Sequence, residues 1–280
     1  MINRILNSLV YPVILFKNII MGLLNHLLLD HFAQEKNWLT NVEVRIKLFY
    51  IGTGLTLNIC AQNCIAPLIL LTSTLILLTS IRIPLKQITL RMALPLLFGI
   101  FIFFIMSLHR GDTVLFSGSL FRYEFSLREE GVSHGLLILS KILGGVMLLL
   151  LLSFTTSITK ICAAARWMKI PETLVETLSF VYRYIFLLMD ETETMMSSQR
   201  SRLGYSSWFR TLRSFGSLGG MLIIRSITRA ENAHTAMISR GYDGGRIFSI
   251  PLPPFEMHDY VILFSSVLFL ISLFTFTLII

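Results

Sequence analysis

Charged residues are scarce in this sequence, and that scarcity excludes a soluble globular protein of ordinary composition. Only 14% of the 280 residues are Asp, Glu, Lys or Arg, 54% are hydrophobic, and the mean hydropathy is +0.72. Soluble domains usually contain about 25% charged residues. The composition therefore predicts a multi-pass membrane protein.

Cysteine and histidine are too few and too scattered to build a disulfide framework or a metal centre. Cys60, Cys64 and Cys162 form an odd set in apolar surroundings, so they are expected to be packing residues. Cys60 and Cys64 could share a helical face, and His26 and His31 lie five residues apart, but neither pair has a third ligand nearby. We expect no bound metal ion and no cofactor.

Motifs for catalysis and for nucleic-acid binding are also missing. The sequence contains no G-x-x-x-x-G-K-[ST] loop for ATP and no nucleophile motif, so no enzymatic activity is expected of this chain. Lys and Arg outnumber Asp and Glu by 24 to 16, but no aromatic residues alternate with them, as they do in many nucleic-acid interfaces. In a membrane protein, such an excess usually reports loop orientation and lipid contact.

Long apolar runs are abundant. A helix needs about 20 mainly apolar residues to cross the hydrocarbon core. The four clearest runs are residues 46–60, 64–81, 92–108 and 258–280. A fifth run, at residues 133–158, contains Lys141, and a sixth, at 174–189, is marginal because Glu176 and Arg183 interrupt it. We expect an all-α fold with about five to six transmembrane helices.

The distribution of lysine and arginine indicates which segments face the cytoplasm, since cytoplasmic loops of membrane proteins are enriched in both. The charged residues among 82–91 are all basic, whereas residues 109–132 contain both arginines and acidic residues. The first segment is therefore predicted to be cytoplasmic and the second external. The basic stretch 159–257 shows helical spacing, which predicts two long cytoplasmic helices. The expected organisation is an N-terminal interfacial segment at 1–45, transmembrane helices at 46–158, this cytoplasmic region at 159–257 with the marginal span 174–189, and a C-terminal transmembrane helix at 258–280.

The polar part of the chain contains a near-repeat, Gln199-Arg200-Ser201-Arg202-Leu203-Gly204-Tyr205 and Met237-Ile238-Ser239-Arg240-Gly241-Tyr242. Each copy has a small residue and an arginine followed by a glycine, so two helices are predicted to end alike. Arginine complements the dipole at a helix C-terminus and glycine tolerates a left-handed cap, so capping alone could explain either copy. The glycines between 204 and 220 favour a hinge between the helices. Steps of three and four residues in the second helix align a stripe that could face a partner: Arg225, Arg229, Asn232, Ala236 and Arg240.

Further motifs accompany these two helix ends: Tyr182-Arg183-Tyr184-Ile185-Phe186, Asp190-Glu191, and Arg229-Ala230-Glu231 upstream of the second copy. Together with Thr155-Thr156 and Ile170-Pro171, they give residues 40–270 a sequence that resembles the transmembrane T component of energy-coupling factor (ECF) transporters, most closely the CbiQ-type branch for cobalt and nickel uptake. In that family two long coupling helices end in small-Arg-Gly motifs, which dock into grooves on a pair of cytoplasmic ABC-type ATPases. The first copy departs from the motif, because Leu203 follows Arg202 and glycine comes only at Gly204.

The resemblance implies a role for each helix end. The ATPase-coupling residues would be Ser201, Arg202, Gly204, Ser239, Arg240 and Gly241, and Arg200 is a possible substitute for Arg202. The supporting surface of the coupling helices would be Arg200, Arg225, Arg229 and Ala236. Lys141 lies inside an apolar run beside Gly144 and Gly145, so this helix is a candidate contact for the S component. The alternative for Lys141 is that its side chain snorkels toward the external end of the helix.

The partners implied by the resemblance are two ABC-type ATPase subunits, a substrate-binding membrane S component and the lipid bilayer, in the cytoplasmic (inner) membrane of a bacterium. ATP hydrolysis would then belong to the ATPases, and the substrate to the S component. Three alternatives stay open: a T component for another micronutrient such as a vitamin, a self-sufficient secondary carrier, and a membrane-bound enzyme or scaffold whose basic stretch binds anionic lipid.

Overall fold

A computed structural model describes residues 38–109, 114–120, 123–243, 255 and 257–279. The chain divides into two compact units. The membrane unit contains the described residues from 38 to 157 and from 255 to 279, and the arm unit contains residues 158–243. The interfacial segment predicted at 1–45 lies outside the described residues up to position 37.

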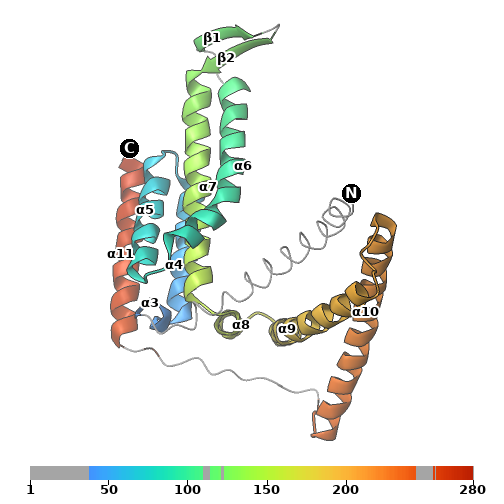
Figure 1. Ribbon diagram of the computed structural model, residues 1–280. Helices are drawn as coiled ribbons and strands as arrows, with labels where there is room; N and C mark the ends of the chain where they lie inside the picture. Colours follow the sequence, from blue (N-terminus) through green and yellow to red (C-terminus); the bar gives the residue numbers. More distant parts are fainter. Residues whose placement is uncertain (1–37, 110–113, 121–122, 244–254, 256, 280) are drawn as a thin grey trace. The chain divides into compact units, whose positions relative to one another are not determined.

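The elements of both units are almost all helices, so the predicted all-α class is confirmed (Figure 1). An antiparallel hairpin of β1 (Val114–Leu120) and β2 (Tyr123–Arg128) joins two long helices of the membrane unit. The helices of the membrane unit are α3 (Trp38–Asn41), α4 (Val44–Cys60), α5 (Ile65–Ser80), α6 (Leu85–His109), α7 (Glu129–Thr155) and α11 (Met257–Ile279). The arm unit consists of α8 (Ile158–Trp167), α9 (Glu172–Ser201) and α10 (Trp208–Ser239).

Three described helices are long and apolar enough to cross a membrane, namely Leu85–Ser107 in α6, Glu129–Thr155 in α7 and Met257–Thr275 in α11. Helix α5 is apolar but shorter, and α4 has only 17 residues with Arg45 and Lys47 near its start. The marginal run 174–189 lies inside α9, which does not meet the same test although it has 30 residues. These results support a polytopic membrane protein and give no support to a sixth span.

Two predicted boundaries were wrong. Helix α6 begins at Leu85 and runs through Pro95, seven residues earlier than the predicted run at 92–108. The run predicted at 133–158 lies in α7, which ends at Thr155, three residues earlier. By contrast, α9 begins at Glu172 directly after Pro171, as the proline and the acid predict.

Helix α7 is the central packing element of the membrane unit, with α4, α5 and α6 lying against it (Figure 1). Its buried Gly144 permits a close approach of α5, since a Cβ there would lie 2.9 Å from the backbone oxygen of Pro67. Leu148 is completely buried one turn further on and joins a core cluster with residues of α4, α5 and α11, including Ile51, Leu70 and Leu273.

Two lysines tie α4 and α7 together at opposite ends. Lys141 Nζ of α7 donates to Ile59 O near the end of α4 at 2.8 Å, and Lys47 Nζ near the start of α4 donates to Thr155 O at the end of α7 at 3.0 Å. The helices are therefore antiparallel. The last four carbonyls of a helix have no partner within it, so each ammonium group satisfies an acceptor that would otherwise be costly in a membrane. Lys141 therefore has a partner within the membrane unit.

A buried charge cluster joins the start of α11 to the start of α4. The backbone N–H of Glu43 donates to Asp259 Oδ1 at 3.2 Å, and Arg45 Nε lies 3.0 Å from Glu43 Oε1. The Arg45 guanidinium also lies over the ring of Phe255, 5.1 Å from its centroid. Burial raises the pKa of Glu43 above its usual value, and the opposite charge of Arg45 partly counters this rise. This cluster fixes the last helix of the chain against the first long one.

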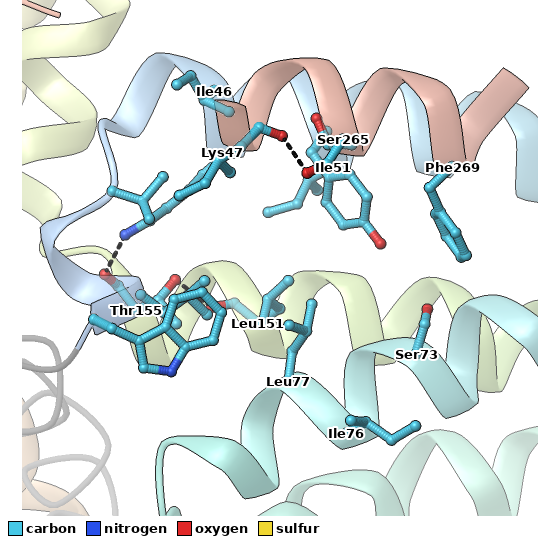
Figure 2. A pocket seen from close by; sticks show the side chains of 16 residues that line it. Ile46, Lys47, Ile51, Ser73, Ile76, Leu77, Leu151, Thr155, Ser265 and Phe269 are labelled. Carbon is cyan, nitrogen blue, oxygen red and sulfur yellow. Dashed lines mark hydrogen bonds between the residues drawn. The ribbon is translucent and has the colours of Figure 1, made fainter. Parts of the chain in front are cut away.

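A cavity of about 400 Å³ lies in the membrane unit among α4, α5, α7 and α11. Figure 2 shows Lys47 at one end, with its ammonium nitrogen directed to the carbonyl of Thr155, and apolar side chains such as Ile51, Leu77 and Phe269 along the walls.

We predict that Gly144→Ala destabilises the membrane unit by about 1–3 kcal/mol, because the added methyl group would overlap the Pro67 carbonyl, which cannot rotate away. The matched control is Gly52→Ala in α4, where nothing lies within 4 Å of the added Cβ. This control should be neutral or stabilising by up to about 1 kcal/mol through helix propensity. Thermal unfolding of the detergent-solubilised protein distinguishes the two variants, and equal midpoints would contradict the close approach of α5 to α7.

Candidate functional site

The two sequence repeats form the C-terminal ends of α9 and α10, and they fold alike. We call residues 201–204 the first tip and residues 239–242 the second tip. Each helix ends at its serine, and each serine hydroxyl donates to the carbonyl four residues earlier: Ser201 Oγ to Ser197 O at 3.1 Å, and Ser239 Oγ to Thr235 O at 2.9 Å. The predicted likeness of the two helix ends is confirmed.

Arginine occupies the same cap position at both tips. Arg202 has φ −91° and ψ 13°, and Arg240 has φ −96° and ψ 11°. Arg202 is therefore the geometric equivalent of Arg240, whereas Arg200 lies two residues earlier, inside α9. The geometry favours Arg202 over its possible substitute.

The second tip closes as a Schellman motif. Gly241 has a left-handed backbone with φ +83°, and its N–H donates to Ile238 O at 2.9 Å. The N–H of Tyr242 donates to Met237 O at 3.0 Å. These two bonds satisfy the last carbonyls of α10, as this cap usually does with glycine at the left-handed position.

The first tip closes in the same way, with leucine at the left-handed position. Leu203 has φ +58°, its N–H donates to Arg200 O at 3.0 Å, and the N–H of Gly204 donates to Gln199 O at 2.9 Å. A left-handed backbone costs a residue with a Cβ about 1–2 kcal/mol. The departure from the motif thus leaves the cap geometry intact and introduces local strain.

Gly204 has a different role from the predicted one. It is not the left-handed residue of the cap; it permits a close approach between the turn and α10. A Cβ on Gly204 would lie 2.9 Å from Gln199 O and 2.7 Å from Ser214 Oγ. The Ser214 hydroxyl donates to Gly204 O at 2.9 Å, so any larger residue would disrupt this contact.

A packed cluster supports the first tip from α10. The Tyr205 hydroxyl donates to Gln199 Oε1 at 2.6 Å, and Gln199 Nε2 donates to Ser214 O at 3.1 Å. The Tyr205 ring lies 5.6 Å from the ring of Phe215, centroid to centroid. Burial raises the pKa of the Tyr205 phenol, and the charge of Arg200 partly opposes the rise. The turn of residues 202–207 is thereby fixed.

The predicted hinge from 204 to 220 is shorter in the structure. Helix α10 begins at Trp208, so Gly216, Gly219 and Gly220 lie inside a continuous helix. Nothing lies within 4 Å of a Cβ added to any of the three. The connection between α9 and α10 is the turn alone.

The arginines of the predicted stripe divide into two groups. Arg229 Nη2 donates to Glu191 Oε1 of α9 at 2.7 Å, and Arg225 Nη1 lies 4.0 Å from Glu191 Oε2. Arg229 of the predicted stripe directs its guanidinium to a half-buried carboxylate of the same unit. Ala236 is exposed. Among the residues that the structure describes, neither Arg202 nor Arg240 forms an ion pair or a side-chain hydrogen bond, and both are exposed.

Glu191 is the residue whose role the sequence did not reveal. The motif Asp190-Glu191 stood out as an acidic pair in a basic stretch, but helical spacing on α9 alone cannot indicate which residue faces α10. We call the ion pairs of Glu191 with Arg225 and Arg229 the Glu191 contact. It lies between the two tips, near a groove of about 360 Å³ that Phe180, Tyr184 and Arg229 help to line.

The tips lie far apart. Gly204 of the first tip contacts Ser214, and from there α10 continues to Arg240. At about 1.5 Å per residue, this length of helix is about 40 Å. One surface groove of ordinary size cannot receive both tips.

The residues of the predicted S-component contact on α7 make contacts within the membrane unit. Gly144 is buried against Pro67 and Asn58, so it is not accessible to a partner. Gly145 approaches Asn58, whose Nδ2 donates to Lys141 O at 2.9 Å. These three residues of α7 serve contacts within the chain.

Metal-ligating side chains do not gather in the part of the chain that the structure describes, where no group of three or more His, Cys, Asp or Glu could hold an ion. The lining of the cavity in Figure 2 likewise includes none of these residue types.

Comparison with known proteins finds similarity to membrane components of transporters. A sequence model of the CbiQ family, described as cobalt transport protein, matches residues 35–250. An uncharacterized protein of Methanocaldococcus jannaschii is 33% identical over 80% of this chain and 84% of its own length. The energy-coupling factor transporter transmembrane protein EcfT of Listeria innocua is 25% identical over 80% of this chain and 88% of its own. A putative fused cobalt transport protein CbiMQ of Methanocorpusculum labreanum is 31% identical over 53% of this chain, which corresponds to 24% of that protein.

We predict that the Glu191 contact holds α9 and α10 together. Glu191→Arg or Arg229→Glu alone should speed backbone amide exchange around the contact about five-fold, as a coupling of about 1 kcal/mol implies. The charge-swapped double variant, Glu191→Arg with Arg229→Glu, should restore slow amide exchange because opposite charges face each other again. Hydrogen–deuterium exchange of α9 and α10 measures the effect.

The control for this prediction is Glu193→Arg, which makes the same charge change at an exposed position two residues away. It should leave the exchange rates as they are. If the doubly exchanged variant opens as readily as the single ones, the ion pair does not hold the helices.

Proposed function

Since the chain belongs to the CbiQ family of cobalt transport proteins, the transmembrane T components of ECF transporters, we propose that it couples two cytoplasmic ABC-type ATPases to a separate substrate-binding membrane component. The chain transmits motion; the chemistry of ATP hydrolysis lies in the partners. Its membrane unit is held in the cytoplasmic (inner) membrane, and its arm unit faces the cytoplasm.

The observation that carries the proposal is the pair of arginines at the C-terminal ends of α9 and α10, which occupy the same cap position with the same backbone geometry. Each is exposed, each follows a small serine, and each is left without an internal partner in the described part of the chain. Because the tips lie about 40 Å apart along the helix, they suit two separate grooves. A pair of ATPase subunits supplies two such grooves.

The chemistry of arginine indicates what lies in each groove. The planar guanidinium can form two parallel hydrogen bonds with a carboxylate, and it loses less solvation than an ammonium on entering a partly dry interface. The serine before each arginine is small enough to let the helix end sink into a groove. We therefore assign an acidic residue of an ATPase subunit as the partner of Arg202, and another as the partner of Arg240.

The rest of the arm unit explains how motion at the tips can be transmitted. The first tip is packed onto α10 through Gly204 and Tyr205, and the Glu191 contact joins the helices between the tips. Movement of either tip therefore displaces α9 and α10 together. When ATP binding closes the two ATPases, the arm unit moves with them and passes the displacement to the membrane components.

Cobalt is the substrate that the names of the relatives favour, and the resemblance to the CbiQ-type branch adds nickel. The ion is recognised by the S component, in keeping with the absence of a His, Cys, Asp or Glu cluster among the described residues of this chain. One relative is named as a fused cobalt transport protein CbiMQ and this chain matches 24% of its length, which supports a close functional partner for the CbiQ part. Another micronutrient is the alternative substrate.

The direct test is capture of purified ABC-type ATPases of the host organism by the detergent-solubilised chain. Wild type should capture them, and Arg202→Glu with Arg240→Glu should lose capture, because each reversed charge would face an acidic groove. Removal of one buried interface arginine commonly costs about 2 kcal/mol or more, and reversal of two should exceed that.

The matched control reverses two exposed cations away from the tips, Lys86→Glu with Arg183→Glu, and should capture the ATPases as wild type does. All variants should elute from size-exclusion chromatography as the wild type does. Undiminished capture by the doubly reversed tip variant would contradict the proposed docking.

A further inference from the structure

Four large apolar side chains are exposed around the first tip. Phe209 is 81% exposed and Trp208 74%, and Leu203 and Leu212 are each more than 60% exposed. Trp208 and Leu212 are four residues apart and Phe209 and Leu212 three, so the three from α10 share one face of its first turns. We call Leu203, Trp208, Phe209 and Leu212 the apolar ridge.

The ridge stands on a rigid base. In the same turns, Thr211 is buried, its hydroxyl donates to Ser207 O at 2.9 Å, and Ser214 holds the turn through Gly204. Tyr205 is buried beneath the turn against Phe215. A preorganised surface of this kind loses little conformational entropy on binding.

Cations surround the ridge. Arg202, Arg210 and Arg213 are all exposed, and Arg210 Nη1 donates to Ser206 Oγ at 2.8 Å, which holds its side chain beside the turn. Tryptophan and arginine are the residues most enriched at the centres of protein interfaces, whereas solvated surfaces favour neither in such density.

The second tip has no equivalent surface in the part of the chain that the structure describes. Among residues 235–243, Ile238 is the only large apolar residue among the exposed ones.

Leucine at position 203 has a conformational cost. Glycine would form the same left-handed cap without strain, as Gly241 does, and leucine adds an exposed apolar side chain. A strained residue that also exposes apolar surface suggests a function for that surface.

Building on the proposed function, we propose that the apolar ridge is an anchor that enters an apolar, acid-rimmed pocket of the ATPase subunit receiving the first tip. Leu203 follows Arg202 directly, and their Cα atoms are about 3.8 Å apart. Whatever surface covers Arg202 therefore reaches Leu203 too, which places the ridge on the ATPase and not in the bilayer.

The test compares the ridge with exposed apolar residues on the same helix. Trp208→Ser with Phe209→Ser should weaken capture of the purified ATPases at least about ten-fold, as truncation of central interface residues does. The matched control, Ile223→Ser with Ile227→Ser, removes two exposed isoleucines from the middle of α10 and should change capture less than about two-fold. Equal affinities of the two variants would overturn the proposal.

Leu203→Gly separates binding from stability. It should leave the thermal unfolding midpoint unchanged or raise it, because strain is relieved, and yet weaken ATPase capture. A purely structural role for Leu203 would not weaken capture, so wild-type affinity in this variant would contradict its place in the anchor.

A fluorescence measurement distinguishes the ATPase from the membrane. A variant with Trp38→Phe and Trp167→Phe leaves Trp208 as the only tryptophan, since the chain has three. In nanodiscs of phosphatidylcholine and phosphatidylglycerol with brominated acyl chains, the Trp208 emission should shift to the blue when ATPase is added and should not be quenched by the bromine. Quenching by the brominated lipid, or no shift with bound ATPase, would overturn the proposal.

The outcome also separates this inference from the proposed function. If Arg202→Glu with Arg240→Glu abolishes capture while the ridge variant binds as wild type does, the anchor is wrong and the coupling role stands. If neither variant changes capture, both are wrong.

Discussion

This structure depends on one requirement: the carbonyl groups at the C-terminal ends of the helices need hydrogen-bond donors. In a membrane those groups find no water, and in the arm unit they would attract any nearby cation. The membrane unit satisfies them with lysines, Lys141 on the end of α4 and Lys47 on the end of α7. The arm unit satisfies them with backbone N–H groups of the residues that follow each tip. Because the backbone completes these caps, Arg202 and Arg240 are not needed for capping and can meet a partner.

Both units contain contacts that fix the ends of their helices. The bond from Lys47 to Thr155 fixes the last residue of α7, and α8 begins three residues later. Within the arm unit, the packed turn under the first tip and the Glu191 contact fix α9 against α10. Both features suit a component that transmits displacement between partners.

Much of this could be predicted from the sequence because it depends on local patterns. Apolar runs predicted the helices of the membrane unit, Pro171 and Glu172 predicted the start of α9, and the near-repeat predicted two helices that end alike. Contacts between segments could not be predicted in the same way. Spacing on α10 placed Arg225, Arg229 and Arg240 on one stripe, but only packing against α9 shows that Glu191 takes Arg229. Gly204 was expected to cap α9, yet Leu203 takes the left-handed position and Gly204 makes room for Ser214, because the turn is set by its tertiary contacts.

The most direct test of the account is photo-crosslinking from the two tips in the assembled complex. A photoreactive amino acid would replace Ser201, Ser239 or, as a control, the exposed Thr228 in the middle of α10. The account predicts that Ser201 and Ser239 each crosslink to an ATPase subunit, at peptides that contain acidic residues, and that Thr228 does not. Crosslinks from both tips to lipid or to this chain itself, with none to an ATPase, would contradict the coupling role of the two arginine tips.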